Sequence, residues 1–184
     1  MKKLQFNGNF IIIGFGSVAA PLMPLLFFTF YLTPERVKVI TADERNKNIA
    51  DHFKLQLNIT PLNEGNYKEV LGAVLKEGDF LVNLSVDVSS IDLIKFASET
   101  GALYMDTCIE PWKGFYTNES LSMKQRTNYA LRKEAMAIKG TLKGSKTAIV
   151  AHGMNPGTVS HFVKAGLVKM AQDGGILGEK PKAR

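Results

Sequence analysis

The chain has 184 residues, 45% of them apolar, and a formal net charge of +6 at neutral pH. This length suffices for one large domain, or for one domain and the beginning of a second, and the apolar content supports a buried core. The lysines and arginines are scattered along the chain, which argues against a protein that binds nucleic acid. The single cysteine, Cys108, excludes an internal disulfide and suits a reducing, cytoplasmic compartment.

No charged residue lies between Leu4 and Pro34, and two lysines precede this stretch. A signal peptide or a membrane span would have a similar composition. The stretch is interrupted by Gly14, Gly16, Pro21 and Pro24, however, and a buried parallel strand followed by a buried helix gives the same hydropathy. Because a regular alternation of strands and helices follows, we favour the buried strand and helix and expect no association with a membrane.

The predicted elements alternate between strand and helix along the chain. In chain order they are a strand at 10–13, a helix at 17–31, a strand at 37–41, a polar helix around 45–53, a short strand at 57–59, a helix at 67–75, a strand at 80–84, a helix from 89 or 90 to 100, a strand at 102–105, a long loop at 107–124, a helix at 127–138, a strand at 147–151 and a helix after Pro156. This alternation predicts the α/β class, with a parallel sheet covered on both faces. The helix at 17–31 is apolar nearly all round, so we expect it to be largely buried, with Pro24 removing one hydrogen bond.

A G-x-G-x-x-A motif lies between the first predicted strand and the first predicted helix, at residues 14–19. Gly14 permits the tight turn, Gly16 lets the backbone approach a pyrophosphate closely, and Ala19 is small enough for helix and strand to pack. The pyrophosphate would lie at the helix N-terminus, beside Ser17 and Val18, where the helix dipole favours negative charge. This arrangement is typical of a Rossmann-type, doubly wound sheet that binds a dinucleotide.

About twenty residues after the motif, the second strand ends in Thr41-Ala42-Asp43-Glu44. A carboxylate at this position accepts hydrogen bonds from the ribose hydroxyls of adenosine, and we expect Asp43 to do so, with Glu44 as the next candidate. Its charge would repel a 2′-phosphate and thus favour NAD over NADP. Arg45 weakens that preference, because an arginine here could pair with such a phosphate. The alternative is a glycine turn followed by an ordinary exposed acid.

Polar segments follow three of the predicted strands, at residues 83–87, 106–112 and 152–157. Ligands of open parallel sheets bind beyond the carboxyl ends of the strands. We therefore expect Asp87, Asp106 and Glu110 to form a local acidic pocket, which would suit a cationic substrate. Asp87 and Asp106 could instead cap helices or brace loops.

The remaining reactive side chains are interpreted as structural. Cys108 would need a lowered pKa or an adjacent base to act as a nucleophile, so we expect a small packed residue. The three histidines are too far apart for a helical metal pair, and no Cys/His spacing predicts a zinc site, although His152 could line the pocket. Trp112 could stack on a cation, but packing is the simpler interpretation.

Five segments together resemble bacterial homospermidine synthases, which belong to the saccharopine-dehydrogenase-like group. They are residues 13–17 (IGFGS), 81–90 (LVNLSVDVSS), 104–112 (YMDTCIEPW), 126–132 (RTNYALR) and 152–162 (HGMNPGTVSHF). The resemblance covers essentially the whole chain and implies an NAD-dependent enzyme that acts on putrescine or a related diamine. In this family the diamine is oxidised to an imine, ammonia is released and a second amine condenses. The same cofactor then reduces the new imine to homospermidine.

The resemblance also implies roles for individual residues. Asp87, Glu110 and Asn155 match positions that line the polyamine site. The positions expected to bind the cofactor are Gly14, Gly16, Ser17, Val18, Asp43, Asn83, Ser85, Thr107 and His152.

Members of this family are much longer than this chain, and a second domain supplies their dimer contacts and further site residues. We therefore expect an NAD-binding domain at residues 1–157 and the beginning of a second domain at 158–184. A homodimer is expected only for the full-length protein, and this chain alone is expected to have little or no turnover and to expose apolar surface. The alternatives are a related amine or amino-acid oxidoreductase with a net redox change, and an NAD-binding module without chemistry.

Overall fold

The computed structural model describes residues 2–139, 141–142, 146–150 and 157–175. The chain divides into two compact units, residues 1–150 and residues 151–184. The first unit holds a sheet with its helices, and the described part of the second is one helix, α6 (Gly157–Asp173). The domain boundary expected after residue 157 stays a prediction.

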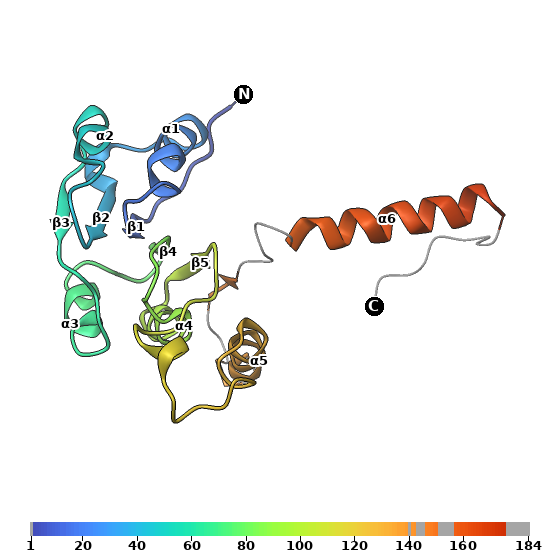
Figure 1. Ribbon diagram of the computed structural model, residues 1–184. Coiled ribbons are helices and arrows are strands. Elements are labelled where there is room, and N and C mark those ends of the chain that lie inside the picture. Colours follow the sequence, from blue (N-terminus) through green and yellow to red (C-terminus); the bar gives the residue numbers. More distant parts are fainter. Residues whose placement is uncertain (1, 140, 143–145, 151–156, 176–184) are drawn as a thin grey trace. The chain divides into compact units, whose positions relative to one another are not determined.

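Six parallel strands form the sheet of the first unit, in the order β3-β2-β1-β4-β5-β6 (Figure 1). They are β1 (Phe10–Ile13), β2 (Val37–Thr41), β3 (Leu57–Ile59), β4 (Phe80–Asn83), β5 (Leu103–Asp106) and β6 (Ala148–Ile149). This is the order of a doubly wound dinucleotide-binding fold, in which β1 and β4 are neighbours at the point where the order reverses. The predicted α/β class and Rossmann-type sheet are confirmed.

Helices cover both faces of the sheet because side chains along a strand alternate between the faces. α1 (Ala19–Thr29) and α2 (Lys47–His52) pack on the face that carries Phe10 and Ile12. α3 (Tyr67–Gly72) and α4 (Ser90–Thr100) pack on the opposite face, which carries Ile11 and Ile13. α5 (Asn128–Ile138) contributes Leu131 to a smaller apolar cluster with α4.

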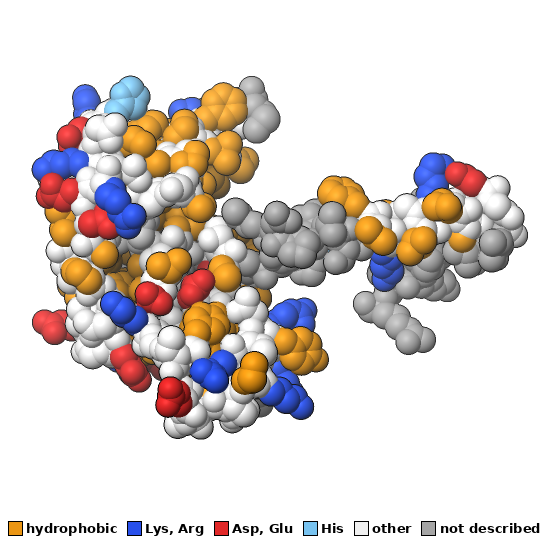
Figure 2. Space-filling view, viewed as in Figure 1, with side chains coloured by type: hydrophobic (Ala, Val, Ile, Leu, Met, Phe, Trp, Pro, Cys, Tyr) orange, Lys and Arg blue, Asp and Glu red, His pale blue; other side chains and the backbone are white. Residues whose placement is uncertain are grey.

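α1 differs from the predicted helix in its bounds and in its burial. It begins two residues later than expected, and it continues through Pro24. Only its inner side packs on the sheet, while Leu25 and Phe28 are each 60% exposed. Figure 2 shows apolar side chains gathered at the surface near this helix. The expectation of a largely buried helix was therefore wrong, because composition alone does not show which side of a uniformly apolar helix has a neighbour. No helix in the described ranges is long and apolar enough to span a bilayer.

α4 follows the sequence prediction most closely. The Ser89 hydroxyl accepts a hydrogen bond from the Asp92 N–H, at 3.2 Å, and thus caps the helix. Gly101 ends it in the left-handed conformation, with φ of 78°. β6 is shorter than predicted, at two residues. The register aligns Ile13, Asn83 and Asp106, so the loops after β1, β4 and β5 begin at one edge of the sheet.

Candidate functional site

A pocket of about 780 Å³ lies beyond the carboxyl ends of β1, β2 and β4. Its wall consists of the glycine turn after β1, the end of β2 with Asp43 and Arg45, residues 60–64, the loop after β4, and Trp112 with Lys113. Ligands of open α/β sheets bind in this position, where the strand order reverses. The first unit alone therefore provides a site of the right size and place for a nucleotide.

The two glycines of the turn have different surroundings. Gly14 has φ of +84°, and a Cβ added there would lie 3.0 Å from three atoms of Ser85, so both its conformation and its contacts require glycine. A Cβ added to Gly16 would meet no atom within 4 Å. Since Gly16 lines the pocket, its missing side chain leaves open the space that a pyrophosphate would need.

The N-terminal turn of α1 faces the same pocket through Ser17 and Val18. α1 begins directly after Val18. In the described structure no side chain accepts a hydrogen bond from the N–H groups of its first turn. Uncapped N–H groups at a helix N-terminus, together with the helix dipole, form a site for an anion. Gly14, Gly16, Ser17 and Val18 are therefore brought together as the sequence predicts, and the residues present fit a pyrophosphate.

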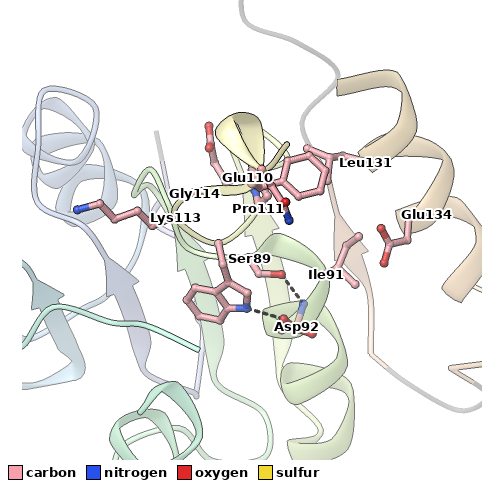
Figure 3. Close-up of a pocket in the computed structure, with 12 residues that line it drawn as sticks. Ser89, Ile91, Asp92, Glu110, Pro111, Lys113, Gly114, Leu131 and Glu134 are labelled. Carbon is pink, nitrogen blue, oxygen red and sulfur yellow. Dashed lines mark hydrogen bonds between the residues drawn. The ribbon is translucent and has the colours of Figure 1, made fainter. Parts of the chain in front are cut away.

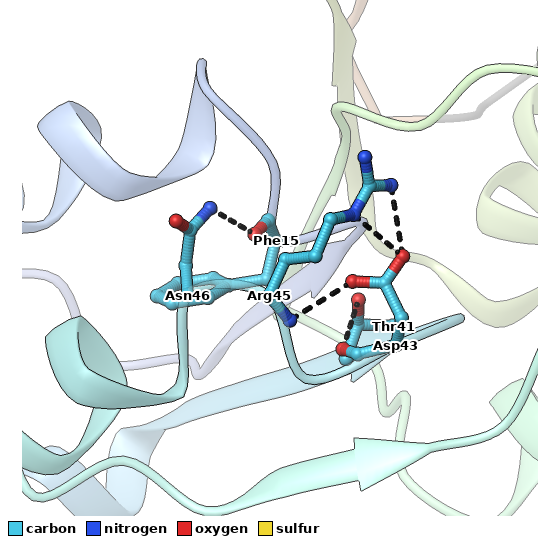
Figure 4. Close-up of polar contacts among 5 residues, drawn as sticks. All are labelled: Phe15, Thr41, Asp43, Arg45 and Asn46. Atoms are coloured by element: carbon cyan, nitrogen blue, oxygen red, sulfur yellow. Dashed lines mark hydrogen bonds and ion pairs between the residues drawn. The ribbon is translucent and has the colours of Figure 1, made fainter.

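Asp43 lines the pocket at the end of β2, and Arg45 holds its carboxylate (Figure 4). Oδ1 accepts the N–H of Arg45 at 3.0 Å, whereas Oδ2 accepts Nε at 2.9 Å and lies 2.8 Å from Nη2. These hydrogen bonds hold the pKa of Asp43 below its ordinary value. Asp43 thus occupies the position predicted for a ribose-binding acid, but it is already paired.

Asn46 connects the loop after β2 to the glycine turn by a hydrogen bond. Its side-chain amide donates to the Phe15 carbonyl at 2.8 Å. The two residues are 31 positions apart. The sequence does not indicate a role for Asn46, because no pattern among its neighbours in the chain predicts a contact with a residue so distant in sequence.

Asn83 lies beneath the pocket rather than in its wall. It is 2% exposed, its Oδ1 accepts the hydroxyl and the N–H of Ser85 at 2.8 and 3.2 Å, and its Nδ2 donates to the Val88 carbonyl at 3.3 Å. Ser85 does line the pocket. Both polar ends of the Asn83 side chain are engaged by the loop after β4, so the side chain positions that loop, and its expected direct contact with the cofactor stays a prediction.

Asp87 and Asp106 lie in different environments although both were expected in one acidic pocket. Asp87 is exposed, lines the pocket and has φ of 61°, an uncommon conformation for a residue other than glycine. Asp106 is 4% exposed, and the Tyr104 hydroxyl donates to its Oδ2 at 3.1 Å. Burial and the neighbouring Asp106 raise the pKa of Tyr104 well above its ordinary value. Asp106 thus supports the site from below and is not part of its wall.

A second pocket, of about 510 Å³, lies between α4, α5 and the segment at 110–118 (Figure 3). Glu110 is among the residues that line this pocket, with Asp92 and Glu134. Glu110 and Asp87 therefore line different pockets. Burial, and then the charges of Glu110, Cys108 and Asp87, raise the pKa of Tyr116, so both carboxylates lie within electrostatic range of its hydroxyl.

Trp112 contributes to both pockets, as does Lys113. The indole N–H donates to Asp92 Oδ2 at 2.7 Å, and the ring centroid lies 5.3 Å from that of Tyr67 (Figure 3). Because a hydrogen bond and a ring contact hold this side chain, the packing interpretation of Trp112 is supported.

Ser90 holds the segment that carries Glu110. Its N–H donates to the Glu110 carbonyl at 2.8 Å, and its hydroxyl accepts the Glu110 N–H at 3.0 Å. The same hydroxyl donates to the Cys108 carbonyl at 3.3 Å. Ser90 is fully buried. The sequence indicates Ser90 only as a possible beginning of a predicted helix, because a contact 20 residues away has no local signature.

Cys108 is exposed, so the expectation of a packed cysteine was wrong. Partial desolvation and then the neighbouring Glu110 carboxylate raise the pKa of its thiol to about 11. The thiol is therefore protonated at neutral pH and is not activated as a nucleophile.

Three expected site residues are not among the residues that line either pocket. Thr107 is half-buried and lines neither pocket. His152 and Asn155 lie outside the described residues. Among the described residues, no group of three or more His, Cys, Asp or Glu side chains could hold a metal ion.

Comparison with known proteins places the chain in a family. The model of the saccharopine dehydrogenase NADP binding domain matches residues 10–150. The chain belongs to this family. It is also 39% identical over 183 residues to a homospermidine synthase from Blastochloris viridis, a match that covers 98% of this chain and 38% of the relative. A homospermidine synthase from Mesorhizobium japonicum is 36% identical over 180 residues, covering 96% and 37% of the two chains.

A solved structure of the homospermidine synthase from Legionella pneumophila in complex with NAD has the same fold. It matches with a TM-score of 0.81 and 38% sequence identity, over 98% of this chain and 37% of that chain. These matches confirm the resemblance to homospermidine synthases. The chain spans about 38% of the length of the curated relatives that it matches.

Proposed function

We propose that this chain is the NAD-binding part of a homospermidine synthase. The observation that carries the proposal is the open space at Gly16, in a pocket at the point where the strand order reverses. Identity of 36–39% to homospermidine synthases over almost the whole chain supports it, as does the related structure in complex with NAD.

NAD would be held by the glycine turn and the two adjoining loops. The pyrophosphate would lie against Gly16 and the first turn of α1, and the adenosine ribose against Asp43. Ser85 would contact the cofactor from the loop after β4, in the orientation that its hydrogen bonds to Asn83 fix. Thr107 and His152 stay proposed contacts through the family resemblance alone.

The proposed overall reaction joins two putrescine molecules into homospermidine with release of one ammonia. Putrescine loses two electrons and two protons to become an imine, the second amine displaces ammonia, and the new imine regains two electrons and two protons. When bound, NAD supplies the acceptor and then the donor of the hydride, so that the reaction has no net redox change. A homodimeric full-length protein and a cytoplasmic location belong to the same proposal.

Asp87, Glu110 and Asn155 are the residues proposed to bind the diamine. A dication suits the carboxylates of Asp87 and Glu110, which would hold the ammonium groups by charge-assisted hydrogen bonds. We expect a related amine dehydrogenase to use similar carboxylates, so the decisive difference is the fate of the reducing equivalents. Because the aligned part is about 38% of the relatives, we expect this chain alone to bind NAD with little or no turnover.

A chimera tests the proposed activity. This chain would replace the aligned residues of the Blastochloris viridis homospermidine synthase, and the products formed from putrescine and NAD would be identified by mass spectrometry. We expect homospermidine and ammonia without accumulation of NADH. Accumulation of NADH with one amine substrate would instead indicate a dehydrogenase, and a folded chimera that binds NAD without forming either product would indicate a binding module.

Two variants of the chimera separate the diamine site from its surroundings. Glu110→Gln should lower the rate of homospermidine formation by about tenfold or more, since a charge-assisted hydrogen bond to the substrate is lost. Glu119→Gln removes an exposed carboxylate from the same loop, at residues 107–124, and should leave the rate unchanged. Equal rates of the two variants would remove Glu110 from the proposed site.

A further inference from the structure

We propose that Arg45 determines nucleotide specificity in this pocket, by allowing NADP to bind as well as NAD. The inference rests on the proposed function, because it concerns the same site. Its starting point is a conflict between position and contacts: Asp43 stands where an acid should reject a 2′-phosphate, yet its carboxylate is bound by the neighbouring guanidinium.

The pairing reduces what Asp43 offers to a ribose. A carboxylate has about four acceptor positions on its two oxygens. Three contacts from Arg45 already reach them, one from the main-chain N–H to Oδ1 and two from the guanidinium to Oδ2. The Arg45 cation also offsets the negative charge that would repel a phosphate. Asp43 therefore opposes NADP less strongly here than an unpaired acid at the same position would.

Arg45 itself is suited to a phosphate. A guanidinium has five N–H donors, and only Nε and Nη2 contact Asp43, so donors remain for a second anion. Its side chain is 82% exposed and lines the pocket beside Asp43. The other cation in the wall, Lys113, comes from the segment after β5, and two strands, β1 and β4, separate β5 from β2 in the sheet. Arg45 is thus the cation placed for the adenosine end of the nucleotide.

The two side chains therefore act in opposite directions. Asp43 favours the free ribose hydroxyls of NAD, whereas Arg45 favours the additional phosphate of NADP. The comparisons contain both nucleotides, since the family model describes an NADP binding domain and the related solved structure holds NAD. In this chain, the opposite charges of Asp43 and Arg45 therefore set the relative affinity for NAD and NADP, and neither nucleotide is excluded.

The test is the affinity of the full chain for both nucleotides, measured by isothermal titration calorimetry. Wild-type protein should bind NAD and NADP. Arg45→Ala should raise the dissociation constant for NADP about tenfold relative to that for NAD, because the phosphate loses its cation and meets an unpaired Asp43. Asp43→Asn should change the ratio in the opposite direction. Arg132→Ala, which removes an exposed arginine of α5 outside the pocket, should leave the ratio unchanged.

The ratio of the two affinities separates specificity from a general structural role, because misfolding would weaken both nucleotides alike. NAD binding without measurable NADP binding by the wild type would overturn the inference and leave the proposed function intact. The same holds if Arg45→Ala changes both affinities equally or neither. If the folded wild type binds neither nucleotide, the inference and the proposed function are both overturned.

Discussion

At the scale of the residue, Gly14 and Gly16 show that one motif contains two separate requirements. Gly14 is required by the fold, because its φ is +84° and a Cβ added to it would lie 3.0 Å from Ser85. Gly16 is required by the proposed ligand, since the space beside it is open and belongs to the pocket. The motif therefore couples the packing of β1 against the loop after β4 to the shape of the nucleotide site.

Substitution of Gly14 should destabilise the protein. We expect Gly14→Ala to lower the free energy of unfolding by about 2–4 kcal/mol, from left-handed backbone strain and from the close contact of the new methyl group with Ser85. Urea denaturation monitored by circular dichroism measures this change. Gly16→Ala serves as the control and should unfold at nearly the wild-type urea concentration; if it proves as unstable as Gly14→Ala, the two glycines are not distinct.

The raised pKa of Cys108 predicts slow reaction with thiol reagents. The rate of alkylation by iodoacetamide should rise about tenfold per pH unit above neutrality and level off only near the pKa of about 11, because the thiolate is the reacting form. Mass spectrometry measures the rate directly, since the chain has one cysteine. Glu110→Gln should accelerate the reaction at a given pH. Rapid, pH-independent alkylation at neutral pH would show an activated thiol instead.

At the scale of the element, the loops after β4 and β5 are held from below by buried polar side chains. Asn83 holds the first loop, and Ser90 holds the second through the backbone of Cys108 and Glu110. The Tyr104 hydroxyl interacts with both of these side chains and with Asp106. Buried networks of this kind fix loop geometry because each unsatisfied polar group would cost free energy.

Ser90→Ala tests this support. The substitution leaves the Glu110 N–H and the Cys108 carbonyl without their side-chain partner, and we expect a loss of about 1–3 kcal/mol in the free energy of unfolding. Differential scanning calorimetry, with Ser98→Ala on the same helix as control, measures it. Equal thermal stability of the two variants would contradict the role assigned to Ser90.

The sequence predicts the elements better than it predicts their contacts. All six strands and the order of the helices follow from local patterns, and the glycine motif correctly locates the pocket. The exposed side of α1, the burial of Asp106 and the contacts of Asn46 could not be predicted, because each depends on residues distant in the sequence. Asp87 and Glu110 were expected in one pocket because both follow strands whose carboxyl ends meet at one edge of the sheet, yet Asp87 lines the nucleotide pocket and Glu110 lines the pocket beside α4 and α5.

At the scale of the whole molecule, the sheet, the glycine turn and the nucleotide pocket all lie within residues 1–150. The apolar side chains exposed on α1 agree with the expectation of apolar surface on this chain. The chain matches homospermidine synthases over 96–98% of its own length and 37–38% of theirs. Nucleotide binding is therefore the part of the proposed function that can be tested on this chain by itself.

The most direct test of the central claim is NAD binding by the wild-type chain and by Gly16→Val, measured by isothermal titration calorimetry. Valine should abolish detectable binding without lowering stability, because its side chain would fill the space proposed for the pyrophosphate and meets no protein atom at the Cβ position. Gly72→Val is the matched control, because a Cβ added to Gly72 also meets nothing within 4 Å and Gly72 does not line the pocket. This variant should bind NAD as the wild type does. Unchanged NAD affinity in Gly16→Val, or no binding by the folded wild type, would contradict the account.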